Sequence, residues 1–145
     1  MGSIKDYMTD DHKRCDDYFA AAEKAVSDGD WETGGTEFNS FRQAMEHHFD
    51  MEEGVLFPEL EEATGMTDGP TAVMRSEHDE MRRLFEQMAM AMEARYEDQY
   101  FDTAETLLIL MQQHNMKEEQ MLYEMADRQL GDHNADTLTR MRELG

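Results

Sequence analysis

Apolar residues recur three and four positions apart over much of this chain, which is the spacing of amphipathic helices. The Ser27-Asp28-Gly29 turn ends the first patterned segment, and Gly54 with Pro58 ends or redirects the second. Pro70 suits the first position of the third helix, and Gly131 stops the fourth. The pattern predicts four long helices, at about residues 5–27, 31–52, 70–92 and 99–130.

A further helical pattern from about residue 134 to 144 predicts a short terminal helix. Strand-like alternation is absent, and no internal duplication is evident. Short connections after the first and third helices favour antiparallel neighbours. The predicted fold is therefore all-α, an antiparallel up-down-up-down four-helix bundle with a short C-terminal helix. We expect one domain over residues 1–145, with its core at about 5–130.

The acidic composition of the chain limits the kinds of molecule that it can be expected to bind. The chain has 34 acidic and 13 basic residues and a net charge of −21, which argues against binding nucleic acid or an anionic membrane surface. No apolar run approaches the length of a membrane span, and the first residues lack the apolar core of a signal peptide. Cys15 has no second cysteine with which to pair. These features predict a cytoplasmic protein.

Each of the four long segments carries one histidine on its apolar stripe. Antiparallel packing would bring two histidines near helix starts and two near helix ends to one level of the core. Two of them are followed four residues later by a glutamate, on the same helix face. The six residues expected to meet in the core are His12, His48, Glu52, His78, His114 and Glu118.

This grouping predicts a metal centre, because two cations would compensate the buried carboxylates. Imidazole with carboxylate suits iron, manganese or zinc. A single histidine on an apolar stripe is more often an ordinary core residue, but four at one level with two carboxylates favour metal. A ferritin-type site uses a Glu-x-x-His spacing, and this chain does not repeat that spacing on two helices.

The segment from Glu46 to Glu53 (EHHFDMEE), with LFP at 56–58, resembles the central motif of the hemerythrin or HHE cation-binding family. The family's other helix motifs are also resembled, by His12, by the Glu77-His78 pair, and by His114 with the glutamates four and five residues later. The resemblance extends over about residues 8–127. It implies two iron ions, with zinc or manganese as alternatives. The implied ligands are His12 and His48 on one ion, His78 and His114 on the other, and Glu52 and Glu118 as bridges.

Two positions depart from the oxygen-carrying members of the family. Met74 stands where they have a further histidine, and Glu119 stands where they have a bridging aspartate. Glu118 is the better bridge by helix face, while Glu119 stays open as an alternative. One imidazole fewer predicts a more open and more symmetric centre.

The resemblance implies a non-heme di-iron protein that binds dioxygen or a related diatomic ligand, as a carrier, scavenger or sensor. The alternatives are a di-iron enzyme acting on peroxide or nitric oxide, an iron store, or a metal-free module that docks a partner helix through its methionines. Of these roles, binding is favoured over enzymatic turnover. The pattern leaves the oligomeric state open.

Several neighbours of these residues have weaker assignments. His47 points about 100° away from His48 and is predicted to face the surface or an edge, and His133 is predicted to face solvent. Cys15 is expected to fill the core, with a redox role as the alternative. Glu53 and Glu77 could bond an imidazole or relay protons, or could be solvated at the surface, and Tyr18 and Tyr123 could lie near the centre by proximity in sequence.

Overall fold

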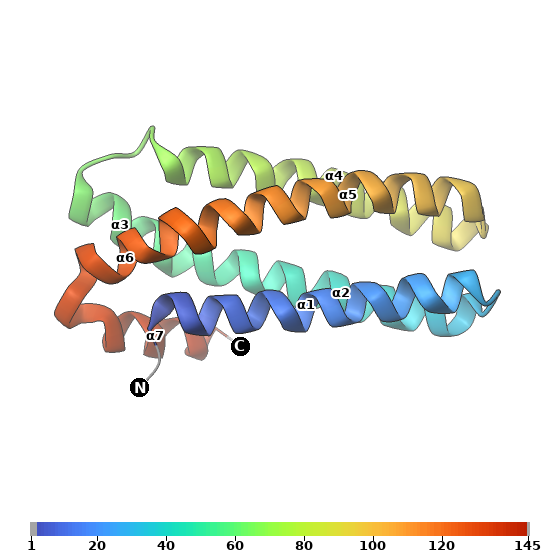
Figure 1. Ribbon diagram of the computed structural model, residues 1–145, viewed down its shortest axis with the longest axis horizontal. Helices are drawn as coiled ribbons and strands as arrows, with labels where there is room; N and C mark the ends of the chain where they lie inside the picture. The colour runs from blue at the N-terminus through green and yellow to red at the C-terminus, as the bar shows by residue number, and fades with distance from the viewer. Residues whose placement is uncertain (1–2, 145) are drawn as a thin grey trace.

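The computed structural model describes residues 3–144, and the described chain is almost entirely helical. Four long helices run alternately up and down, side by side along one axis (Figure 1). The predicted all-α, up-down-up-down four-helix bundle is confirmed. The four helices are α1 (Ile4–Ser27), α2 (Trp31–Met51), α4 (Pro70–Ala94) and α5 (Glu97–Lys117).

The second helix continues past Gly54 and Pro58, and the fourth continues to Leu130, as its predicted stop at Gly131 requires. A five-residue π-helical turn follows each: η1 (Glu52–Leu56) after α2, and η2 (Glu118–Leu122) after α5. Helix α3 (Phe57–Thr64) and helix α6 (Tyr123–Leu130) then carry the chain onward. Of the two roles predicted for Gly54 and Pro58, ending the helix is wrong: a π turn lies there instead, and the chain leaves the helix only at Gly65, whose φ of 73° is left-handed.

The π turns have a simple origin in hydrogen bonding. The Phe57 N–H donates to the Glu52 carbonyl, and the Tyr123 N–H donates to the Glu118 carbonyl, each across five residues instead of four. A wider turn brings residue i+5 round to nearly the same helix face as residue i. The side chains that follow each π turn therefore face the same interior as the glutamate that opens it.

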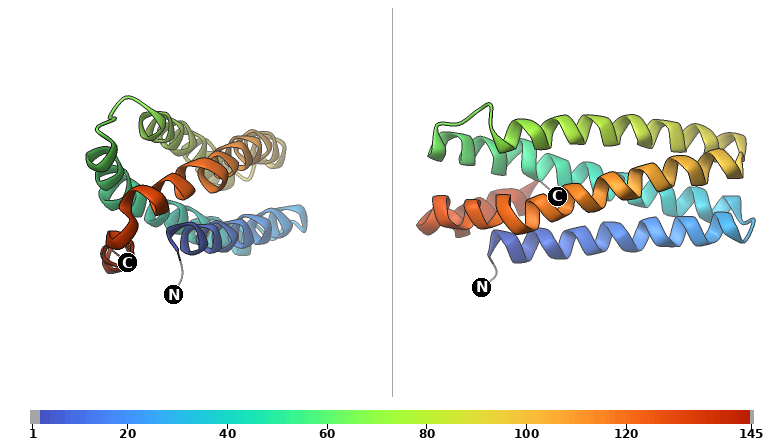
Figure 2. Two further views of the ribbon diagram at one scale, coloured as in Figure 1. Left: turned by 60° about the vertical axis from the view of Figure 1, so that its left-hand side comes forward. Right: turned by 45° about the horizontal axis from the view of Figure 1, so that its top comes forward.

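The chain closes with a 3₁₀ turn, η3 (Gly131–His133), and the predicted terminal helix, α7 (Asn134–Glu143). Figure 2 shows α7 folded back beside the end of the bundle that holds α3 and α6. Thr137 and Arg140 of α7 both bond Glu59 of α3. Among the described residues, no helix is long and apolar enough to cross a membrane.

Helix ends follow capping rules. The Ser3 hydroxyl accepts a bond from the Asp6 N–H at 3.0 Å, and the Asp30 carboxylate accepts one from the Thr33 N–H at 3.1 Å. Asp127 of α6 accepts bonds from the backbone N–H groups of Ile4 and Lys5, at 2.9 and 3.3 Å. The first turn of α1 is thereby fixed to α6.

The interior consists of two apolar clusters. The first, which includes Phe41, Phe85 and Leu107, fills the half of the bundle nearer the α1–α2 and α4–α5 turns. The second, which includes Leu56, Phe57 and Met141, lies among the π turns and helices α3, α6 and α7. Eight methionines are buried in these clusters, so core filling accounts for most of the unusual methionine content. The predicted histidine level falls between the two clusters.

Two adjacent glycines in α2 provide a matched test of the α1–α2 packing. A Cβ on Gly34 would lie 3.0 Å from Val26 Cγ2, whereas a Cβ on Gly35 would meet nothing within 4 Å. We expect Gly35→Ala to raise the free energy of unfolding by about 0.5–1 kcal/mol, since alanine favours helix. Gly34→Ala should show no such gain. Urea unfolding of both variants checks this, and equal stabilisation would contradict the close approach at Gly34.

Candidate metal centre

Four buried histidines, one from each long helix, meet at one level of the bundle. His12 of α1 faces His48 of α2 with ring centroids 4.6 Å apart, and His78 of α4 faces His114 of α5 at 4.9 Å. None is more than 4% exposed. Every imidazole directs Nε2 toward the interior. The convergence expected from the stripe register is therefore present in the structure.

Two glutamates lie between these histidine pairs, both fully buried. Glu52 places Oε2 3.6 Å from His48 Nε2 and Oε1 3.0 Å from His78 Nε2. Each carboxylate oxygen of Glu52 thus faces a different pair.

Glu118 is placed to serve both pairs as well. Its Oε1 lies 3.1 Å from His12 Nε2 and 3.3 Å from His114 Nε2. The two glutamates come from the first residues of the two π turns, so they face each other across the centre.

Several of these buried polar atoms have no hydrogen-bond partner: Glu52 Oε1, Glu118 Oε2, His78 Nε2 and His114 Nε2. Unpaired charge and unpaired lone pairs in the interior are costly, and a cation would remove the cost. Ligand atoms close enough together to hold an ion occur in two groups: Glu52, His78, His114 and Glu118, and His12, His48 and Glu118. The donor set therefore fits metal cations.

Over residues 3–126 the chain matches the family model of the hemerythrin HHE cation binding domain. The chain belongs to the hemerythrin family. Comparisons with curated proteins and with solved structures gave no match. Binding of metal cations is what the family description specifies, and the cluster of buried histidines and glutamates provides the place for it in this hemerythrin domain.

Outside the inner cluster, each imidazole of the hemerythrin centre donates its Nδ1–H to a carboxylate. This bond fixes the tautomer that leaves Nε2 free, and it makes Nε2 a stronger donor to a metal. The four bonds are His12 to Glu119 (2.7 Å), His48 to Asp11 (2.8 Å), His78 to Glu53 (2.7 Å) and His114 to Glu77 (2.7 Å).

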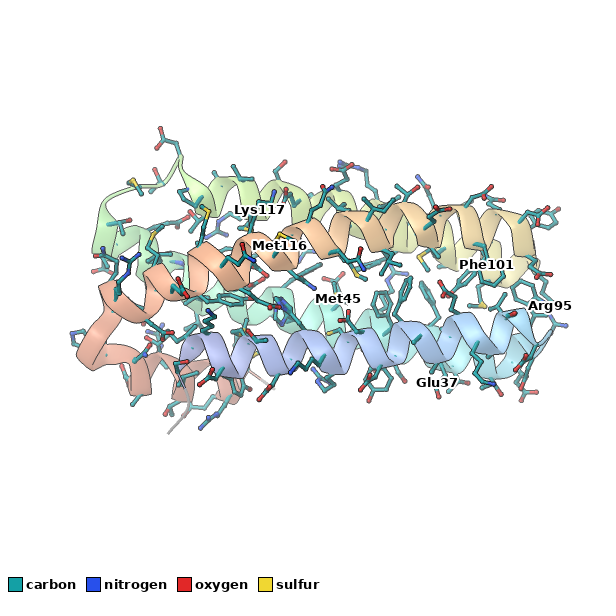
Figure 3. The ribbon with its side chains drawn as sticks, in the orientation of Figure 1. Glu37, Met45, Arg95, Phe101, Met116 and Lys117 are labelled. Carbon is teal, nitrogen blue, oxygen red and sulfur yellow. The ribbon has the colours of Figure 1, made fainter. Side chains whose placement is uncertain are left out.

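Basic residues hold three of these outer carboxylates in place. Arg14 Nε donates to Asp11 at 2.9 Å, and Arg82 donates to Glu53 at 3.1 and 3.2 Å. Lys117, labelled on α5 in Figure 3, pairs with Glu77. A chain with few basic residues places three of them around this centre.

The two adjacent glutamates considered as bridges, Glu118 and Glu119, differ in burial and in position. Glu119 bonds His12 from outside and its side chain is 32% exposed, while Glu118 is fully buried among the imidazoles. The structure therefore places Glu118, and not Glu119, inside the cluster. Glu53 and Glu77 take the imidazole-bonding option of the two that the sequence left open. Asp11 was missed, although its place next to His12 parallels that of Glu77 next to His78.

The centre has an approximate two-fold symmetry, as expected with Met74 in place of a further histidine, and this symmetry extends to the outer carboxylates, which the sequence did not reveal. The residue before the histidine of α1 or α4 supports the histidine of the following helix: Asp11 supports His48, and Glu77 supports His114. The residue after each inner glutamate supports a histidine of the opposite helix pair: Glu53 supports His78, and Glu119 supports His12. The unit α1–α2–η1–α3 thus corresponds to α4–α5–η2–α6.

Mutual charges govern protonation in the metal-free centre. Burial alone would lower the pKa of His114, but the charge of Glu118 and its hydrogen bond outweigh burial and raise that pKa to about 9. The pKa of His48 is likewise raised by Glu52 and Asp11 against the effect of burial. Burial would raise the pKa of Glu53, yet its bonds with His78 and Arg82 hold it at about 2. Without metal, protons on imidazole balance the carboxylates.

Tyr123 was a candidate from the sequence only because it follows Glu118 closely in the chain. Its hydroxyl is fully buried, donates to Glu52 Oε2 at 2.7 Å and lies 2.9 Å from Glu118 Oε1. The same oxygen lies 3.2 Å from His12 Nε2 and 3.3 Å from His48 Nε2. Burial and the two carboxylates raise the pKa of Tyr123 well above its ordinary value, so the phenol is neutral in the metal-free protein.

The remaining neighbours lie outside the centre. His47 is partly buried at the surface between α1 and α2, in a pocket that Tyr18 also lines, and His133 is exposed. Cys15 is buried in the first apolar cluster, and burial raises the pKa of its thiol to about 11. A thiol in that state is a core filler and not a nucleophile.

Removing one outer carboxylate should weaken the centre without dismantling it. We expect Asp11→Asn to lower the affinity for one metal ion by roughly 10- to 100-fold, because the amide supports the basicity of His48 less well than the carboxylate. Asp10→Asn, one exposed residue earlier, makes the same charge change and is the control. Titration with Zn²⁺ against a chromophoric chelator measures both. Equal affinities would show that the bond from His48 to Asp11 does not tune the site.

Metal binding should also depend on pH in a defined direction. His114 keeps its proton up to about pH 9 in the metal-free protein, and a metal binds only the neutral imidazole. Zn²⁺ affinity should therefore rise with pH toward that value, with proton release on binding. Conversely, the stability that the raised pKa gives the metal-free fold is complete below about pH 6.5 and is lost as the pH rises toward 9. Calorimetry in buffers of different ionisation enthalpy checks the release, and identical heats would contradict it.

Proposed function

We propose that this hemerythrin domain is a non-heme di-iron protein that binds dioxygen or a related small diatomic ligand. The proposal rests on one observation above others: Glu52 and Glu118, both fully buried, each reach from one histidine pair to the other. This is the arrangement expected of carboxylates that bridge two cations. The proposed ligands are His12 and His48 on one ion, His78 and His114 on the other, and Glu52 and Glu118 between them.

The donor chemistry favours iron. Four imidazoles and two carboxylates, with no thiolate in either ligand group, suit iron, manganese and zinc alike. Two nitrogens and two carboxylate oxygens per ion leave room in a six-coordinate shell for a small ligand. A ferrous pair supplies electrons for binding dioxygen, which zinc cannot do. The chain's part is to hold the imidazoles in one tautomer and to exclude bulk water from the level between the two apolar clusters.

An apolar pocket beside the centre supports a small uncharged ligand. It has a volume of about 300 Å³ and lies between α4 and the η2–α6 segment, lined mostly by Met74, Val73, Met121, Leu122 and Met125. Met74 precedes His78 by one helical turn, and Leu122 follows Glu118 by four residues. Two of the lining residues are therefore helical neighbours of candidate ligands. Diatomic gases partition into such apolar spaces, while ions do not.

A second candidate function is an enzyme that acts on peroxide or nitric oxide at the same centre. The observation that favours it is the Tyr123 hydroxyl, an O–H donor in contact with both inner glutamates. Such a donor could supply a proton to a reacting ligand. Binding and turnover share the same metal ligands, so experiment has to separate them.

The deciding experiment starts from metal-free protein loaded with ferrous iron under anaerobic conditions. We expect about two irons per chain by elemental analysis, and a visible absorption band that forms with oxygen and disappears when oxygen is removed. Such reversibility supports the binding function. Sustained consumption of peroxide or nitric oxide by the loaded protein would support the enzyme instead. A chain that retains no iron would refute both.

Variants of adjacent histidines test the ligand set. His48→Ala should lose at least one iron per chain and lower the melting temperature of the loaded protein, because ligation contributes to folding free energy. His47→Ala removes the neighbouring imidazole, which faces the surface pocket, and should keep both irons. Elemental analysis and thermal unfolding with and without iron make the comparison. If both variants kept two irons, the assignment of His48 would be wrong.

A further inference from the structure

The two halves of the centre differ at the residue that follows each π turn. Phe57 follows η1 and Tyr123 follows η2, and these are corresponding positions under the approximate two-fold symmetry. The Phe57 ring centroid lies 5.8 Å from that of His78, and the Tyr123 ring centroid lies 5.7 Å from that of His12. The aromatic rings are therefore placed alike. What distinguishes them is one atom, the phenol oxygen.

That oxygen lies among the donor atoms of one half only. Tyr123 Oη is within 3.3 Å of the Nε2 atoms of both His12 and His48, and within 2.9 Å of oxygens of Glu52 and Glu118. In the other half, Nε2 of His78 lies 3.0 Å from Glu52 Oε1 and Nε2 of His114 lies 3.3 Å from Glu118 Oε1, and neither makes a well-aligned hydrogen bond. The phenol oxygen thus lies between the imidazoles of His12 and His48, where one metal ion would bind. Phe57 provides no such oxygen between His78 and His114.

The surroundings exclude a purely space-filling role for this hydroxyl. A phenylalanine fills the equivalent place beside His78 with the same ring, so the tyrosine adds only a polar atom. A fully buried hydroxyl is retained at a cost unless it is bonded, and every partner of this one is a candidate metal ligand. A cation bound by His12 and His48 would be coordinated by the same atoms that now contact the hydroxyl. Because the phenol oxygen lies among those atoms, it would then be within coordination distance of the cation.

We propose that Tyr123 is a ligand of the metal ion held by His12 and His48, and that it makes the two metal positions chemically unequal. This inference rests on the di-iron function proposed above. On ligation the Tyr123 O–H bond breaks, an Oη–metal bond forms, and the proton passes to solvent; no electron is transferred. An anionic oxygen donor favours the ferric over the ferrous state, so this iron is the harder one to reduce. The His78 and His114 iron, beside the apolar pocket, keeps its open position for the diatomic ligand.

The test uses the full chain loaded with two ferric ions. A phenol oxygen on ferric iron gives an intense visible charge-transfer band, so we expect this band in the unaltered protein. Tyr123→Phe should abolish it while keeping two irons per chain by elemental analysis. Phe57→Tyr, the matched change in the other half, should leave the original band in place. In the double variant Tyr123→Phe with Phe57→Tyr, a band that returns with a shifted maximum would place the phenol on the other ion.

A second measurement needs no variant. Resonance Raman spectra excited in the band should contain ring modes that shift when the protein is made with ring-deuterated tyrosine. Two bound ferric ions without a band, or a band that survives Tyr123→Phe, would overturn the role of Tyr123 while leaving the di-iron function intact. Failure to retain iron at all would overturn the function itself. The two failures are therefore distinct.

Discussion

Two carboxylates buried in the middle of a helical bundle are the constraint on which the rest of this structure depends. Glu52 and Glu118 have no solvent to stabilise their charge, and each leaves an oxygen without a hydrogen bond. Such groups are tolerated inside a protein only when positive charge accompanies them. Protons on the surrounding imidazoles provide it in the metal-free chain, and cations provide it in a hemerythrin domain that has bound metal.

The bundle is organised around this requirement. One apolar cluster lies on each side of the polar level, so apolar packing holds the helices together both above and below the centre. The outer carboxylates orient the imidazoles, and Arg14, Arg82 and Lys117 orient three of those carboxylates in turn. The side chains that would touch a metal are thus restrained by others that do not. Restraint of this kind, by groups that do not touch the metal, is what a precise metal site requires.

Helical periodicity was sufficient to predict the bundle and the six inner residues, because each lies on an apolar stripe and the antiparallel order fixes the level. It was insufficient for the π turns, because a hydrogen bond across five residues leaves no trace in a pattern of threes and fours. Tyr123 therefore had only its proximity in sequence as support, since it is the π turn that brings its side chain to the same face as Glu118. Asp11 was missed because its bond to His48 depends on how two helices pack, which a single-helix pattern does not encode.

The π turns also determine which side chains of the following helices, α3 and α6, face the interior. Each contains one residue more than an ordinary helical turn, and loss of that residue would rotate the following helix by about 100°. In η2 such a rotation would carry Tyr123 out of the interior. It would also swing Asp127 away from the backbone of Ile4, where it secures the first turn of α1. A single-residue deletion here would therefore alter the inner chemistry and the docking of the amino-terminal helix together, which ties the chain's length at this point to its function.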